Sequence, residues 1–230
     1  MDQLEQRRGF LTFAGMSLAL AACKAEKDEA DAGDVSAVED LMREHGVIRR
    51  ILVVYREAAP RLRVNAAAVP PAALQQAALL MQSFGENYHE KLLEEGHLFP
   101  AVKKAGGAAA SLIDPLLAQH QRGREITDYV LSSTKPGIVS ANAEALASAL
   151  EGFARMYEEH AAQEDTIVFQ AWKKALSKKQ LSDMAEMFEE IEHKTFGKDG
   201  FDDARDKIAS IEGELGITLA SLLPPPPPKT

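Results

Sequence analysis

The chain has 230 residues, with 26 Lys and Arg against 35 Asp and Glu, a formal net charge of −9 and 46% hydrophobic residues. This length and apolar content allow one domain with extensions, or two small domains, around a sizeable core. The negative charge argues against nucleic-acid binding, which needs a basic face. The single Cys excludes a disulfide framework and a Cys-based zinc or iron–sulfur site. Any metal must therefore be held by His and carboxylate side chains.

Residues 1–22 have the features of an export signal. Arg7-Arg8 precede an apolar run over 10–22, which is shorter than the roughly 20 residues of a permanent membrane span. The twin arginine followed by Phe-Leu resembles a Tat signal, and the sequence LAAC at 20–23 resembles a bacterial lipobox. We therefore expect export to the periplasmic side of a bacterial membrane, with a lipid anchor at Cys23.

Two segments flank the predicted folded part. Residues 23–35 consist of the predicted lipidated Cys and a charged stretch of small residues, and this composition predicts a flexible tether. Residues 217–230 contain five consecutive prolines and predict an extended tail. Between them we expect a helical bundle over 36–175 and a helical extension over 176–216.

Helix signals occur throughout the part between tether and tail. Ser36 with Glu39 forms a capping box that predicts a helix from Ala37, and Pro60 is predicted to end it. Long helices are predicted over about 37–60, 71–100, 108–133 and 140–175, and shorter ones over about 178–196 and 202–215. No segment shows the alternation of a strand. We therefore expect an all-α protein, an antiparallel four-helix bundle with additional C-terminal helices.

Two stretches of the chain repeat a pattern of histidines and acids. The segment HEKLLEEGHLF from His89 aligns with HAAQEDTIVF from His160, with a gap of one residue. The helix before each carries Leu, His and Arg at the same spacing, in LMREHGVIR around His45 and LLAQHQRGR around His120. The chain therefore contains two copies of a helical hairpin. The first helix of each supplies a His, and the second supplies a His with a carboxylate.

This arrangement predicts a metal centre. His160 and Glu164 are four residues apart, so both point the same way from one helix. Two such hairpins bring four His and two carboxylates into the interior of a bundle, where the carboxylates need a compensating charge. A pair of metal ions supplies it, and imidazole suits iron, zinc, copper and nickel. The site is richer in nitrogen than a ferritin-like one, which pairs Glu-x-x-His motifs with further Glu.

The first repeat departs from this spacing. His89 and Glu94 are five residues apart, about 140° around an ideal helix. A one-residue π-bulge would restore their alignment, and such bulges are frequent at functional sites. Glu90 and Glu95 stay as competing metal ligands or outer-sphere partners on this helix, and Asp165 competes with Glu164 on the other.

The quoted motifs resemble the hemerythrin-like, or HHE cation-binding, family over about residues 36–215. The resemblance implies a four-helix bundle with a non-haem di-iron centre, bridged by carboxylates and an oxygen species. Its implied terminal ligands are His45, His89, His120 and His160, and its implied bridges are Glu94 and Glu164. Oxygen-carrying members have a fifth His where this chain has Arg124. That position is therefore open, or is filled by Glu90 or another carboxylate, and simple reversible oxygen carriage is placed in doubt.

The resemblance implies two iron ions, although such ligands accept other divalent metals. It favours a binding protein over an enzyme, one that takes oxygen, nitric oxide or peroxide for sensing, scavenging or iron handling. One alternative is a di-iron peroxidase or oxidase, and another is a structural or interaction bundle with zinc or no metal. A sensor of this kind would need a partner protein, and the sequence does not identify a redox or signalling partner. His97 and His193 are not expected to be ligands. Tyr88 and Tyr157 are expected to pack, with a hydrogen bond to the outer sphere of the site as the alternative.

Overall fold

The computed structural model describes residues 35–135 and 142–228. The predicted export signal, Cys23 and nearly all of the tether lie outside these residues, so their predictions stay open. The described part contains helices and connecting turns but no strand. The prediction of an all-α protein is therefore confirmed for this part of the chain. None of its helices is both long and apolar enough to cross a membrane.

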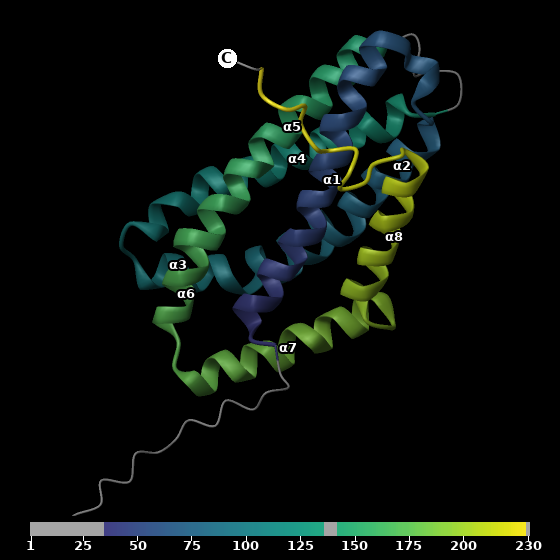
Figure 1. Ribbon diagram of the computed structural model, residues 1–230. Coiled ribbons are helices and arrows are strands. Elements are labelled where there is room, and N and C mark those ends of the chain that lie inside the picture. The colour runs from purple at the N-terminus through teal and green to yellow at the C-terminus, as the bar shows by residue number, and fades with distance from the viewer. Residues whose placement is uncertain (1–34, 136–141, 229–230) are drawn as a thin grey trace, which may run out of the picture. The chain divides into compact units, whose positions relative to one another are not determined.

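In the described residues the bundle consists of four helical rods, which are drawn in Figure 1. The first is α1 (Ala37–Asn65), followed by the short η1 (Ala66–Ala68). The second runs through α2 (Pro71–Leu80), η2 (Met81–Leu98) and α3 (Phe99–Ala105), and the third through η3 (Ala109–Leu112) and α4 (Ile113–Ser133). The fourth runs through α5 (Ala143–Gln163), η5 (Glu164–Val168) and α6 (Phe169–Ala175). α1 packs against α5 and η2, and α4 packs against the same two rods, as the predicted antiparallel bundle requires.

Several helix boundaries follow from local sequence signals. The Ser36 hydroxyl accepts a hydrogen bond from the Glu39 backbone N–H at 3.3 Å, so α1 begins where its capping box predicted. Pro71 occupies the first position of α2, where its missing N–H costs nothing. Ser177 and Gln180 form both bonds of a capping box at the start of α7 (Lys178–Phe196). That helix ends at Gly197, whose φ of 69° is left-handed and suits glycine.

The prediction that Pro60 ends the first helix is wrong, because α1 continues through it to Asn65. A proline inside a helix loses one hydrogen bond and costs about 3 kcal/mol. Ala58, Ala59 and Leu62 are almost fully buried on either side of Pro60. Burial of these side chains offsets the proline, since one buried leucine contributes about 1.5–3 kcal/mol. The second rod likewise continues past Pro100, to Ala105.

The C-terminal extension packs onto the bundle through aromatic side chains. Figure 1 shows α7 crossing near the start of α1, with α8 (Gly200–Glu214) returning alongside α1 and α2. Phe188 of α7 stacks on Trp172, with ring centres 5.8 Å apart, and Phe196 lies 5.1 Å from Tyr88. The extension therefore shares the core of the bundle and covers the side on which Tyr88 lies.

Candidate metal centre

The structure gathers all six residues that the repeat singled out. His45 comes from α1, His89 and Glu94 from η2, His120 from α4, His160 from α5 and Glu164 from η5. Each exposes at most 3% of its surface. Six ionisable side chains are thus held inside one bundle, where burial is unfavourable unless each finds a partner.

The predicted π-bulge is present, and it is longer than expected. All of η2 is π-helical, so His89 and Glu94 lie one above the other, with His89 Nε2 3.3 Å from Glu94 Oε1. The Phe99 N–H bonds to the Glu94 carbonyl five residues back. The fourth rod has its own π-helical turn in η5, which the sequence analysis missed, and the Phe169 N–H bonds there to the Glu164 carbonyl. Both rods therefore change their winding beside the carboxylates of the centre.

The Nε2 atoms of the four histidines face the two carboxylates. Glu94 Oε2 lies 3.4 Å from His120 Nε2, while its other oxygen faces His89. Glu164 Oε2 lies 3.1 Å from His160 Nε2 and 3.4 Å from His45 Nε2. Each carboxylate therefore reaches a histidine of both hairpins, which is the arrangement that a bridging ligand needs.

The Nδ1 atoms point the other way, and each has a hydrogen-bond partner. The four pairs are His45–Asp165 at 2.7 Å, His89–Glu44 at 2.5 Å, His120–Glu95 at 2.9 Å and His160–Gln119 at 2.9 Å. An acceptor at Nδ1 favours the tautomer that carries its proton there, and this leaves the Nε2 lone pair free to bind a metal.

These contacts place the competing acids. Glu95 and Asp165 meet Nδ1 atoms, so they orient imidazoles from outside the ring of Nε2 atoms. Glu44 and Gln119 were missed by the sequence analysis, although both directly precede a predicted histidine at the same place in the repeat. Phe99 and Phe169 also act in parallel, stacking on His120 and His45 with ring centres 5.5 and 5.2 Å apart.

The centre contains buried polar atoms that no protein group satisfies. Both oxygens of Glu94, both oxygens of Glu164 and His89 Nε2 have no hydrogen-bond partner. Ligand atoms of Glu94, His120, His160 and Glu164 lie within 4.8 Å of one another, as do those of His45, His89 and Glu94. A further group consists of Glu90, Glu95 and His120. This donor set fits metal cations, because a bound cation would neutralise the carboxylates and use the free lone pairs.

The pKa values of these side chains show that the site attracts positive charge. Burial alone would lower the pKa of His89, but Glu94 and Glu44 raise it well above its ordinary value. Burial would raise the pKa of Glu94, yet His89 and His120 hold it well below the usual range. A proton and a metal ion therefore compete for the Nε2 lone pair of each histidine.

Glu90 forms a separate polar group beside the centre. Its side chain is 1% exposed, accepts a hydrogen bond from the Tyr157 hydroxyl at 2.7 Å, and accepts another from Arg124 at 3.1 Å. Tyr157 therefore does more than pack. Its hydroxyl lies against Gly123, where any Cβ would overlap it, so glycine is required there. Glu90 and Tyr157 line a cavity of about 10 Å³ among the histidines and carboxylates, room for about one water molecule.

The remaining candidates lie outside the centre. Arg124 bonds Glu95 at 2.5 Å as well as Glu90, and Arg49 pairs with Asp165. His97 is half-buried against Phe188, and His193 is exposed, so neither contributes to the centre.

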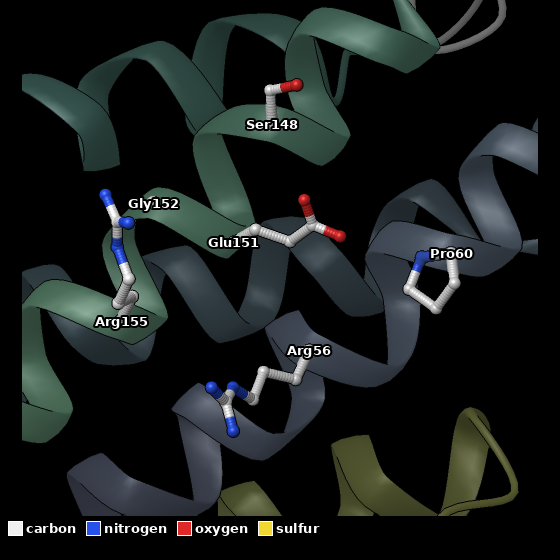
Figure 2. Close-up of a pocket in the computed structure, with 6 residues that line it drawn as sticks. All are labelled: Arg56, Pro60, Ser148, Glu151, Gly152 and Arg155. Carbon is white, nitrogen blue, oxygen red and sulfur yellow. The ribbon is translucent and has the colours of Figure 1, made fainter.

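A larger hollow lies on the surface between α1 and α5, away from these residues. Figure 2 shows its lining, with Arg56 and Pro60 on α1, and Ser148, Glu151, Gly152 and Arg155 on α5. Arg56 pairs with Glu158 at 3.0 Å, and Glu151 is held by Arg63. The pocket contains no side chain of the buried centre, so its size does not make it the functional site.

Comparisons with known proteins give one family match and relatives in mycobacteria. The model of the hemerythrin HHE cation binding domain matches residues 36–172. Uncharacterized proteins of Mycobacterium tuberculosis H37Rv and of Mycobacterium bovis are each 41% identical over 212 residues, which cover 87% of this chain and 82% of theirs. No solved structure matches the chain.

Proposed function

Because the chain belongs to the hemerythrin HHE cation-binding family, we propose that it is a non-haem di-iron protein. One iron would be held by His45 and His89 and the other by His120 and His160, with Glu94 and Glu164 between them. The observation that carries this proposal is the set of four unpaired oxygens on these two carboxylates, facing the Nε2 atoms of both hairpins. Buried carboxylates without partners are costly, and a pair of cations removes that cost.

The proposed ligand of the iron pair is oxygen or a related small molecule, nitric oxide or peroxide. The iron pair would supply the electrons and an open coordination position for such a ligand. The chain's own residues keep the site small, since the cavity of about 10 Å³ admits only a molecule of a few atoms. The Nδ1 partners hold the imidazoles in place. Sensing, scavenging and iron handling are the roles that we propose for such a protein.

A di-iron peroxidase or oxidase is the second candidate, and Glu90 is the observation that favours it. A buried carboxylate with a phenol at 2.7 Å lines the cavity, where it is able to hold or pass a proton. The two candidates differ in turnover. An enzyme consumes peroxide or oxygen repeatedly in the presence of a reductant, whereas a binding protein takes up one ligand per centre and stops.

Metal analysis of protein purified without oxygen, with absorption spectra before and after air, tests the proposal. We expect about two irons per chain and new near-ultraviolet and visible bands on exposure to air. Bands that reverse when oxygen is removed indicate a binding protein, and permanent bands indicate redox chemistry or iron handling. An iron-free chain, or one holding a single zinc, would leave the bundle and remove this function in favour of a structural role.

We also propose that the protein is exported and anchored by a lipid at Cys23, on the features of residues 1–23. Cell fractionation of the full chain and of Cys23→Ser tests this proposal. The anchored protein should follow the membranes, and the variant should become soluble. Unchanged partitioning of Cys23→Ser would contradict the anchor without affecting the metal centre.

A further inference from the structure

The first helices of the two hairpins hold their histidines with matching contacts. His45 and His120 each bond the acid that follows a central carboxylate, Asp165 and Glu95 respectively. In both cases an arginine four residues after the histidine, Arg49 or Arg124, pairs with that same acid. The first helix of each hairpin therefore receives the same support at Nδ1, with no difference in charge.

The histidines on the second helices, His89 and His160, have Nδ1 partners that differ in charge. His89 Nδ1 bonds the carboxylate of Glu44 at 2.5 Å, and both side chains are at least 98% buried. His160 Nδ1 bonds the amide oxygen of Gln119 at 2.9 Å, and Gln119 is only half-buried. At equivalent places, one imidazole therefore meets a buried negative charge and the other meets a neutral dipole.

This difference acts on the metal through the imidazole ring. A carboxylate at Nδ1 makes Nε2 a stronger electron donor, and loss of such outer partners costs typically 10–100-fold in metal affinity. Glu90 is an additional acid near the second pair, but it lies 3.9 Å from His120 Nδ1 and is held by Arg124 and Tyr157. Its charge is thus shared with a guanidinium and does not reach an imidazole through a hydrogen bond.

We propose that the two metal positions are unequal, and that the position of His45 and His89 binds a divalent cation more tightly and fills first. The position of His120 and His160 is then the exchangeable one, so the chain is able to hold two different metals. This inference rests on the proposed pair of metals. It predicts a difference of about 10–100-fold between the two affinities.

The full chain loaded with two Co²⁺ ions and exposed to increasing EDTA tests the inference. Release is followed by the visible absorption of Co²⁺ and by metal analysis. We expect two steps of one ion each, separated by about 10–100-fold in chelator. Anomalous X-ray scattering from crystals of the half-loaded chain should place the remaining ion between His45 and His89.

Exchanging the two Nδ1 partners gives the matched variants. Gln119→Glu should move the weaker step toward the tighter one, and Glu44→Gln should move the tighter step toward the weaker one. Gln121→Glu adds the same charge at an exposed position of α4 and should change neither step. Because Gln119→Glu gains affinity, it stays informative even if Glu44→Gln folds poorly.

Three results would overturn the inference and leave the metal pair intact. They are a single release step from the wild-type chain, a remaining ion between His120 and His160, and unchanged steps in Gln119→Glu. A wild-type chain that holds fewer than two Co²⁺ ions would instead overturn the proposed function, and this inference with it.

Discussion

The two hairpins bring the same types of side chain into the centre but differ in the side chains beside it. Where the first has Ile48, the second has Gly123, which leaves room for the Tyr157 hydroxyl. Glu90 occupies the place that corresponds to Ala161. Every imidazole has an Nδ1 partner in both hairpins, although Glu44 and Gln119 differ in charge. The contacts that have no counterpart in the other hairpin gather on one side as a buried polar group. The repeated contacts therefore fix the four imidazoles, while Glu90 and Tyr157 make one face of the cavity polar.

The largest expected effect comes from removing a candidate metal ligand that occurs in both hairpins. Glu94→Ala should lose both metals, because its two oxygens face histidines of both hairpins. His160→Ala should lose only the ion of its own hairpin. Both changes should also destabilise the chain by about 3–5 kcal/mol, since buried charged partners are left alone. Metal analysis and denaturant unfolding measure the two effects.

His193→Ala is the control for these variants, because His193 is exposed and lies outside the centre. It should keep the wild-type metal content and stability. Two metals in Glu94→Ala would show that this carboxylate does not join the two halves.

The next largest effect should come from filling the space that Gly123 leaves for the Tyr157 hydroxyl. A methyl group at Gly123 overlaps the Tyr157 hydroxyl, so Gly123→Ala must displace the phenol and break its bond to Glu90. Overpacking and the loss of a hydrogen bond to a buried acid together should cost about 2–4 kcal/mol in the free energy of unfolding. Urea unfolding of the purified chain measures this loss.

Gly152→Ala is the matched control. This glycine also lies inside a helix, but a Cβ there has no neighbour within 4 Å. Since alanine favours helices over glycine by up to about 1 kcal/mol, this variant should be unchanged or more stable. Equal losses in the two variants would contradict the special role of Gly123.

A third test uses the pH dependence of stability, which should report on the buried carboxyl group of Glu86. Burial raises the pKa of Glu86 from 4.5 to about 7, against the hydrogen bond that it accepts from Thr127. Ionisation of Glu86 therefore lowers the free energy of unfolding. This loss is absent below pH 4.5, grows between pH 4.5 and pH 7, and is constant above pH 7. Glu86→Gln should be more stable than wild type by on the order of 2 kcal/mol at pH 8, and equally stable at pH 4.5.

Unfolding of both proteins at the two pH values checks this difference. Glu125→Gln, at an exposed position of the neighbouring helix, should show no dependence of this kind. A gain for Glu86→Gln that is the same at both pH values would point to packing rather than to ionisation.

The smallest effect should come from removing a single hydroxyl. Tyr157→Phe keeps the ring and leaves Glu90 with Arg124, so we expect a loss of about 1 kcal/mol and no loss of metal. A change in metal content would instead mean that the phenol holds Glu90 on the metal pair.

Sequence reasoning predicted the bundle, and it singled out six residues that the structure brings together, because both depend on spacing along a helix. The repeat placed four histidines and two acids inside, and the five-residue step from His89 to Glu94 predicted the π-helical winding. It left Glu90, Glu95 and Asp165 as alternatives, because the choice depends on how closely two helices approach. Pro60 was misjudged for a related reason, since burial of its neighbours outweighs a local helix breaker.

The enclosure of the centre has a kinetic meaning. With at most 3% of any of its six side chains exposed, an ion or ligand cannot arrive by diffusion alone. Its entry waits for a transient opening of the bundle, so the rate of uptake should become independent of ligand concentration at high concentration. That limiting rate is a property of the helices, and amide hydrogen exchange along α5 and η5 would report on the same motion.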